Sequence, residues 1–341
     1  MDREAWAAVH VVAAVGDRER MKTKTKSRSV ALAALLVTSV PALAAEQYPA
    51  SPVDGKPATM AVAQPDFAAP EEAAKALTDA IRAEDPQALA ALIGPDSEEW
   101  IFTGDNVLDR VDWISFLEAW DKRHAVVKVD DAMAIMTVGE DEWPFSAPIV
   151  KRGGRWLFDG EAGRVEMTRR RVGRNELDTI QTLLAITDAQ LEYASIDIDG
   201  NGFHEYAGRF ISTPGARDGL YWPIEAGEAP SPLGPLIGEA AREGYEAPSD
   251  EPQPYHGYRY RMLTEQGQNA PGGAYSYLVD GRLIGGFAVV AYPARYNVSG
   301  IMTLMVNHMG RVYQKDLGDD TDTIVAEFDS FNPDESWTEV K

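Results

Sequence analysis

The chain has 341 residues, a formal net charge of −22 and no cysteine. This excess of acidic side chains repels nucleic acid phosphates and anionic lipid headgroups, which argues against nucleic-acid binding and against a role on a membrane surface. The lack of cysteine excludes disulfides, thiol catalysis and cysteine metal sites. The length predicts two domains, because single compact cores rarely grow this large.

Residues 21–45 have the pattern of a secretory signal peptide. Four basic side chains between positions 22 and 28 precede a short apolar run, and Pro41 is followed by Ala42-Leu43-Ala44, small residues that suit a signal peptidase. The apolar run is too short to span a bilayer, although a buried amphipathic helix is an alternative interpretation. We therefore expect a periplasmic or secreted mature protein with no membrane span, and we interpret residues 1–20 as a mis-assigned upstream extension.

The first predicted domain covers residues 70–165 and follows a Pro- and Ala-rich flexible linker at residues 46–69. Helical spacing of apolar residues predicts three helices. The first begins near Pro70, the second lies within residues 84–94, and the third lies within residues 109–124. Short strands follow, and Gly153-Gly154 predicts a hairpin turn between two of them. This order resembles the cone-shaped α+β fold of cystatins and ketosteroid isomerases over about residues 70–162. That fold includes enzymes and inactive proteins, so the resemblance implies no activity.

The second predicted domain, residues 166–341, opens with a long helix. Asn175 suits an N-cap and Asp178 suits the first helical turn, so the sequence predicts a helix start at Asn175 after the basic stretch MTRRRVGR. Leu177, Ile180 and Leu184 begin a broad apolar face that predicts burial.

A loop, one short helix within residues 231–245, several strands and a closing helix within residues 319–331 follow. The segments FAVVAY and IMTLMV are apolar on both faces, which predicts central strands of a sheet. A long helix across an antiparallel sheet resembles the globular half of type IV pilins and pseudopilins. The chain departs from pilins because a whole domain precedes the helix.

Several long and unusual stretches resemble an exported bacterial family named only as domain of unknown function 2950. They include RNELDTIQ, RFISTPGARDGLYWP, YHGYRYRMLTEQG and VNHMGRVYQKDLG, and the resemblance runs from about residue 70 to the C-terminus. It implies an exported protein and no assigned activity.

The segment DIDGNGFHEYAG, residues 197–208, begins like the calcium loop of an EF-hand. The candidate ligands are Asp197, Asp199, Asn201, the Phe203 carbonyl and Glu205. Gly208 stands where an EF-hand has a bidentate glutamate, and the next segment, YAGRFIST, is interpreted as a strand rather than a second helix. We therefore expect a structural Ca²⁺ clip, with an acidic turn that binds no ion as the alternative.

Two other groups of residues are candidates for function. His256 lies among tyrosines and arginines, as an acid–base group would, although a histidine hydrogen-bonded at a strand start is the alternative. A tyrosine-rich groove for a sugar or a peptide is the second candidate, and packing of the sheet is its alternative. The groove candidates are Tyr221, Trp222, Tyr258, Arg259, Tyr260, Arg261 and Tyr275.

The sequence thus favours an exported, non-enzymatic binding or assembly protein of the cell envelope, with a protein or polysaccharide partner of unknown identity. The alternative is a periplasmic hydrolase that uses His256 with a nearby carboxylate. A hydrolase should bring His256, a carboxylate and Arg259 or Arg261 into one cleft. The binding hypothesis needs an exposed apolar patch or a tyrosine outside the core.

Overall fold

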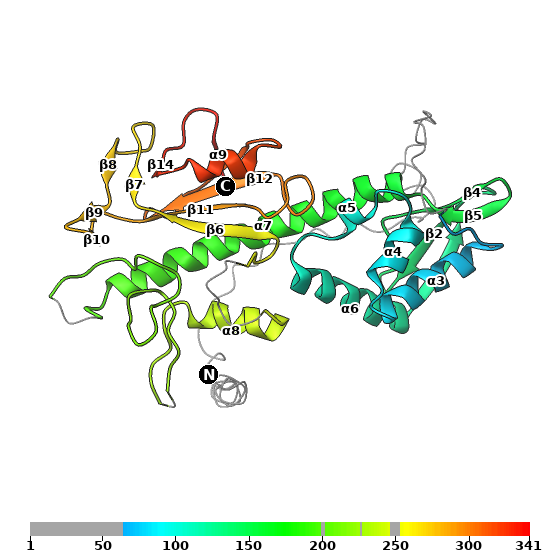
Figure 1. Cartoon of the computed structure of the whole chain (residues 1–341), viewed down its shortest axis with the longest axis horizontal. Coiled ribbons are helices and arrows are strands. Elements are labelled where there is room, and N and C mark those ends of the chain that lie inside the picture. Colours follow the sequence, from blue (N-terminus) through cyan, green and yellow to red (C-terminus); the bar gives the residue numbers. More distant parts are fainter. Residues whose placement is uncertain (1–63, 199–201, 226, 246–252) are drawn as a thin grey trace.

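A computed structural model describes residues 64–198, 202–225, 227–245 and 253–341. The fold is α+β, as predicted, and one long helix runs through both halves of the elongated molecule (Figure 1). The signal peptide at residues 21–45, the extension at 1–20 and most of the predicted linker lie outside the described residues.

The first half packs four helices against an antiparallel sheet. The helices are α3 (Pro70–Arg82), α4 (Pro86–Ile93), α5 (Glu98–Ile101) and α6 (Asn106–Lys122). The strands are β1 (His124–Lys128), β2 (Met133–Val138), β3 (Trp143–Pro144), β4 (Ile149–Arg152) and β5 (Arg155–Phe158). They pair in the order β1-β2-β4-β5, with β3 on β2, and the β4–β5 hairpin turns at Gly153-Gly154 as predicted.

The core of this half lies between the sheet and helices α3 and α4. Leu77, Ile93, Met136, Ile149 and Phe158 are almost completely buried in it. Residues 64–69, predicted as the end of the linker, join this domain, because the backbone of Phe67 pairs with Trp156 on the edge strand β5. The folded chain therefore begins before α3.

Helix α7 (Gly160–Ala194) is longer than the sequence predicted. Asp159 caps its N-terminus by accepting a hydrogen bond from the Ala162 N–H at 3.2 Å. The predicted start at Asn175 is wrong: Asn175 is buried in mid-helix, where its Nδ2 donates to the Ser299 carbonyl at 2.9 Å. Within the basic stretch before Asn175, Arg169 and Arg170 pair with Glu166 one helical turn away, and such pairs favour the helical conformation.

The second half is built on a five-stranded antiparallel sheet that lies along the second part of α7 (Figure 1). Its strands are β6 (Tyr258–Leu263), β11 (Ala288–Pro293), β12 (Met302–Asn307), β13 (Val312–Asp316) and β15 (Thr338–Glu339). The order β15-β13-β12-β11-β6 places β11 and β12 inside the sheet, which confirms their prediction as central strands.

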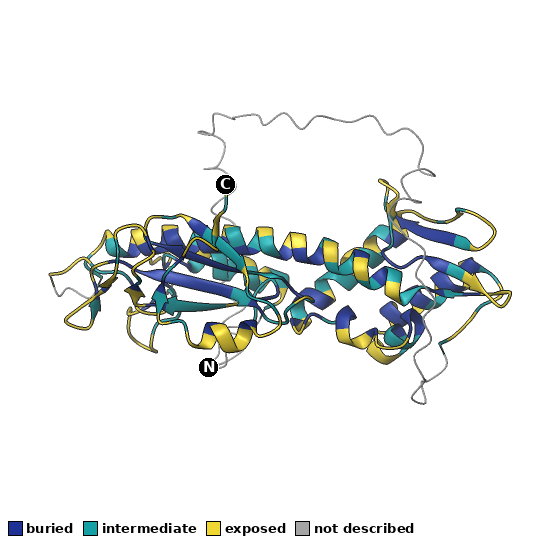
Figure 2. Cartoon of the chain, turned by 90° about the horizontal axis from the view of Figure 1, so that it is seen from above, coloured by how far each residue is buried: buried dark blue, intermediate teal, exposed yellow. Residues whose placement is uncertain are grey.

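Side chains alternate between the two faces of this sheet. Val289 and Ala291 of β11 face a core with Leu183 and Ile186 of α7. Ala288 and Val290 face a second core under helix α9 (Thr321–Ala326). Both faces are therefore covered, which explains why these strands are apolar throughout. Figure 2 shows the resulting dark blue strands beside the striped surface of α7.

The remaining elements surround this sheet. They are helix α8 (Gly234–Glu243) and the short strands β7 (Glu265–Gln266), β8 (Tyr275–Ser276), β9 (Leu278–Val279), β10 (Arg282–Leu283) and β14 (Ser330–Phe331). The segment YAGRFIST is not a strand as predicted, because only Tyr206 and Ile211 form single bridges. In the part of the chain that the structure describes, no helix has the length and apolar character of a membrane span.

The two halves also touch directly beside α7. Arg295, from the loop after β11, donates to the carbonyls of Phe102 and Glu99, each at 2.6 Å. The Asp105 carboxylate accepts hydrogen bonds from the Tyr245 hydroxyl at 2.7 Å and from the Gly257 N–H at 3.2 Å. The predicted domain boundary at residue 165 falls within α7, so a continuous helix and these contacts connect the two halves.

Candidate functional site

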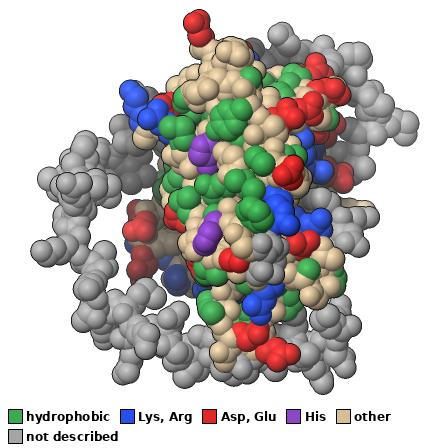
Figure 3. Space-filling view, turned by 90° about the vertical axis from the view of Figure 1, so that its left-hand side faces the viewer, with side chains coloured by type: hydrophobic (Ala, Val, Ile, Leu, Met, Phe, Trp, Pro, Cys, Tyr) green, Lys and Arg blue, Asp and Glu red, His purple; other side chains and the backbone are tan. Residues whose placement is uncertain are grey.

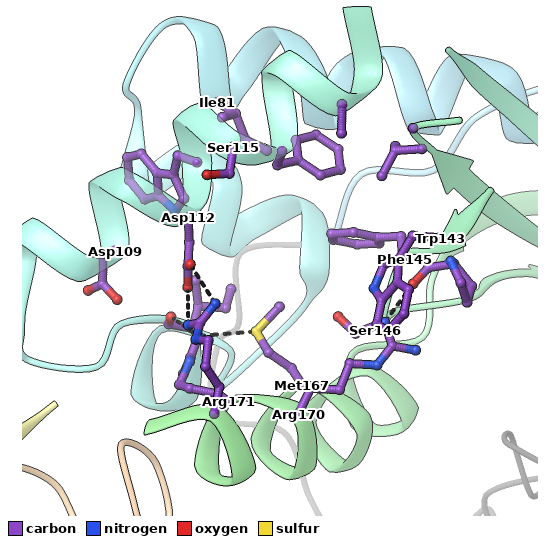
Figure 4. A pocket seen from close by; sticks show the side chains of 18 of the residues that line it. Ile81, Asp109, Asp112, Ser115, Trp143, Phe145, Ser146, Met167, Arg170 and Arg171 are labelled. Carbon is purple, nitrogen blue, oxygen red and sulfur yellow. Dashed lines mark hydrogen bonds and ion pairs between the residues drawn. The ribbon is translucent and has the colours of Figure 1, made fainter. Parts of the chain in front are cut away.

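A cavity of about 700 Å³ lies in the first half, between α6, the β3 strand and the start of α7 (Figure 4). Its wall is mainly apolar and aromatic, with contributions from Ile81, Trp113, Phe116, Trp143, Phe145 and Met167. Polar and charged side chains also line it, most of them on α6 and α7, with Asp141 and Ser146 between strands β2 and β4. The cavity therefore combines an apolar interior with a small polar wall, as small-molecule sites do.

The position of α6 explains why the space is open. Asp105 caps this helix by accepting from the Leu108 N–H at 3.0 Å, and the helix runs for 17 residues. Only Leu108, Asp109 and Trp120 are buried on it, because much of its inner face borders the cavity rather than a packed core. The cavity-facing rings of Phe116 and Phe145 meet edge to face, with centroids 5.6 Å apart.

Three arginines of α7 line the polar side: Arg170, Arg171 and Arg174. Arg170 donates to Glu166 at 2.5 Å and to the Pro144 carbonyl at 2.7 Å, and its guanidinium lies 5.0 Å from the centre of the Trp143 ring. Trp143 is 59% exposed, so this cation–π pair forms part of the rim. Arg174 makes a two-point ion pair with Asp112 of α6, at 2.9 and 2.8 Å.

Arg171 is buried and has a different set of partners. Its Nη1 donates to the Trp100 carbonyl at 2.7 Å, and its Nη2 donates to the Ile101 carbonyl at 2.8 Å and lies 3.3 Å from the Met167 sulfur. These carbonyls end the short helix α5, where a cation is favoured. Burial lowers the pKa of Arg171, and the nearby Asp109 carboxylate opposes that shift.

Asp109 is an acidic side chain of the cavity wall that is buried. Thr103 donates to it from its backbone N–H, 3.1 Å from each carboxylate oxygen, and from its hydroxyl at 2.9 Å. Burial raises the pKa of Asp109 to about 6, although the Thr103 hydrogen bonds and the charge of Arg171 act in the opposite direction. Asp109 thus changes charge close to neutral pH.

His256, predicted as an acid–base group, lies between two carboxylates. Its Nδ1 is 3.7 Å from an oxygen of Asp178 on α7, and its Nε2 is 3.5 Å from an oxygen of Glu243 on α8. Arg259 and Arg261 alternate with the residues of β6 that face α7, and Arg261 donates to the Val325 carbonyl of α9. The structure therefore brings carboxylates to His256 but not these arginines.

The predicted tyrosine groove is divided among several places. Tyr258 is fully buried under α7, where its hydroxyl donates to the Met302 carbonyl at 3.0 Å, and Tyr260 contacts the same core. Tyr221 and Trp222 pack partly against that core, whereas Tyr275 is 38% exposed on β8.

Tyr275 belongs to the end of the molecule that carries β8, β9 and β10. Leu278, Val279 and Ile284 are also exposed there. Figure 3 shows this end, where hydrophobic side chains lie among charged ones. The binding hypothesis needs an exposed apolar patch or a tyrosine outside the core, and Tyr275 at this end lies outside the core.

The calcium loop is described only in part. Asp197 accepts a hydrogen bond from the Gly202 N–H at 2.9 Å, and Glu205 lies 3.5 Å from Arg282 Nη1. Phe203 is exposed, with the Arg282 guanidinium 5.3 Å from its ring centre. Asp199 and Asn201 lie outside the described residues, which contain no cluster of three or more histidine or acidic side chains that could hold a metal ion. The Ca²⁺ site therefore stays a prediction.

Sequence reasoning missed the cavity and its charged groups. By its local pattern, the RRR run at residues 169–171 indicates only a basic stretch before the helix. Extending the helix back through Glu166 would have placed Arg170 and Arg174 one turn apart on one face, next to Arg171. No local signal could have placed that face opposite Asp109 and Phe116.

Residues 64–340 match the family described as protein of unknown function, DUF2950, so the chain belongs to that family. This match confirms the predicted family. No curated protein and no solved structure matches the chain. The resemblances to pilins and to the cystatin and ketosteroid-isomerase cone therefore stay predictions.

Proposed function

We propose that this protein is an exported binding protein of the cell envelope that holds a small, largely apolar molecule in the cavity of its first half. The cavity is the observation that carries this proposal. Its volume of about 700 Å³ falls within the range of sites that enclose a small organic molecule, and aromatic side chains form much of its wall.

The bonding of the polar groups favours binding over catalysis. Arg170 and Arg174 are held by ion pairs, and Arg171 is held by the carbonyls that end α5. Both oxygens of Asp109 accept hydrogen bonds from Thr103. A bound molecule would therefore meet polar groups that already have hydrogen-bond or ion-pair partners, rather than a free base or a free nucleophile.

Filling the cavity tests this proposal. Ala119 lines the cavity from α6, so Ala119→Phe should occupy part of it, whereas Glu118→Phe adds the same ring to an exposed position of the same helix. The neutral dye N-phenyl-1-naphthylamine would be titrated into the chain from residue 46 onward, with fluorescence as the readout. Wild type and Glu118→Phe should bind it alike, and Ala119→Phe should weaken binding by about tenfold or more, since a ring displaces much of the contact area.

Equal binding of the dye to all three proteins would contradict the proposal, because the dye would then be held elsewhere. Circular dichroism spectra and melting temperatures of the variants would confirm that each one folds. Export has its own test: the tagged full-length chain should be recovered from the periplasm or the medium and should lose its first 45 residues, whereas a cytoplasmic and uncleaved chain would contradict export.

A second candidate function, a hydrolase that uses His256, is favoured by the carboxylates on either side of its ring. His256→Ala should then abolish hydrolysis of p-nitrophenyl butyrate by the purified protein. Activity that is absent from wild type, or unchanged in His256→Ala, would contradict this candidate.

A further inference from the structure

We propose that the molecule held in the cavity is an organic monocarboxylate, an acid with an apolar body, whose carboxylate faces Arg171. This inference rests on the proposed function and specifies its ligand class. It depends on the different partners of the three arginines on the cavity wall.

The apolar side chains of the cavity wall indicate that the body of the ligand is apolar. Trp113, Phe116, Phe145 and Met167 present rings and a thioether to the cavity. Such side chains favour aliphatic or aromatic groups, because burying apolar surface is favourable and because methionine adapts its shape. A fully polar ligand would leave this wall without matching contacts.

The positive charge of Arg171 indicates that the head group of the ligand is an anion. A guanidinium has five N–H donors, and the contacts of Arg171 use two on carbonyls and direct Nη2 at the Met167 sulfur. Carbonyl and thioether groups carry no net charge, so the positive charge of this buried side chain is not neutralised by contact. Among the described residues no carboxylate forms an ion pair with Arg171, and a buried unpaired charge is costly.

The neighbouring arginines offer no comparable site. Arg170 contacts Glu166, and Arg174 contacts Asp112 through two hydrogen bonds. A ligand anion would have to compete with these carboxylates. Arg171 is thus the lining arginine whose charge an incoming anion could neutralise without displacing a partner.

The acidic side chains nearby limit the charge of the head. Asp109 and Asp112 of α6 and Asp141, after β2, line the same cavity, and the first two carboxylates act electrostatically on Arg171. A phosphate dianion would be repelled by these carboxylates, whereas a carboxylate brings a single negative charge. A carboxylate also suits the planar geometry of guanidinium donors.

A series of ligands with one tail and different heads tests the inference. Decanoate, 1-decanol and decyltrimethylammonium would each displace N-phenyl-1-naphthylamine from the wild-type chain at pH 7. We expect decanoate to displace the dye at about a tenfold lower concentration than decanol, as a charge-assisted contact predicts, and decyltrimethylammonium to be the weakest.

Variants then assign the preference to one residue. Arg171→Met should make decanoate and decanol equally effective, and Arg171→Lys should keep part of the preference because it keeps the charge. Arg169→Met is the matched control, because Arg169 is exposed on the same helix and does not line the cavity. If Arg171→Met does not fold, the wild-type series and Arg171→Lys still decide the question.

The outcomes separate the two proposals. Absence of cavity-dependent dye binding would contradict the proposed function itself. Dye binding with equal displacement by decanoate and decanol, or a preference for decanoate that survives in folded Arg171→Met, would overturn the carboxylate inference alone.

Discussion

The two halves of this protein use their sheets differently. In the second half, α7 and α9 cover both faces of the sheet, and Phe287, Val289 and Val290 are completely buried. In the first half, α6 stands against the sheet with a cavity of about 700 Å³ beside it. The second half thus covers its sheet on both faces, whereas the first half leaves an open space beside its sheet, and our proposed function places a small molecule in that space.

The largest expected difference is in stability. Phe287→Ala removes a fully buried ring from a packed core and should lower the free energy of unfolding by about 3–5 kcal/mol. Phe116→Ala removes a partly buried ring that already borders the cavity, so it should cost only about 1–2 kcal/mol. Urea unfolding followed by circular dichroism measures both values. Equal losses would show that the two halves are packed alike.

The Asp109 carboxyl of the cavity should make the stability of the protein depend on pH. The pKa of Asp109 is about 6 in the folded chain, above its usual value of 3.8, so the folded state binds more protons between these pH values. The contribution of Asp109 to stability is therefore complete below about pH 4 and is lost as the pH rises through 6. The groups that face it are Thr103, Asp105 and Arg171.

Asp109→Asn isolates this contribution because asparagine does not titrate. Relative to the variant, wild type should lose on the order of 3 kcal/mol of unfolding free energy between pH 4 and pH 7. Parallel stability profiles of the two proteins, measured by urea unfolding at several pH values, would contradict the raised pKa.

Removing the hydroxyl of either of two tyrosines in the second half should change stability by a smaller amount, and the two losses should differ. Tyr258→Phe removes a hydroxyl that donates to the Met302 carbonyl in a buried place, which should cost about 1 kcal/mol. Tyr275→Phe at the exposed end should change stability by less than about 0.5 kcal/mol. Thermal unfolding compares them. A larger loss of stability for Tyr275→Phe than for Tyr258→Phe would contradict this expectation, because the exposed hydroxyl would then stabilise the fold more than the buried one.

The smallest expected effect concerns the predicted calcium loop. Calorimetry with Ca²⁺ should show binding heat for wild type and none for Asp199→Ala, because Asp199 is one of the few carboxylates that the loop offers. Equal melting temperatures of wild type in Ca²⁺ and in chelator would count against a structural ion.

Local patterns predicted much of the fold. Continuous apolar segments predicted the central strands β11 and β12, and Gly153-Gly154 predicted the β4–β5 turn. The start of α7 was missed because Asn175 is a good capping residue by its local context. In the structure, its side chain instead reaches the distant Ser299 carbonyl. Long-range contacts of this kind override local preference.

The candidate site could not be predicted because a cavity is a property of packing. The helical spacing of Val111, Ile114, Leu117 and Trp120 predicts the apolar face of this helix, but Ile114 is exposed in the structure. Trp113 and Phe116 of the same helix line the cavity instead, and a periodic pattern is the same whether a face meets a core or a space. Asp109 comes near Arg171 only once α6 and α7 are placed side by side. The sequence therefore directed attention to tyrosines that mostly pack the second half.

A crystal structure determined under xenon pressure would test the contrast between the halves most directly, because xenon enters apolar cavities without needing the natural ligand. We predict xenon among Phe116, Phe145 and Met167 in the first half, and none between α7 and the sheet of the second half. A first half without xenon, in which these side chains close the space, would contradict the proposal that the protein keeps a cavity for a small molecule.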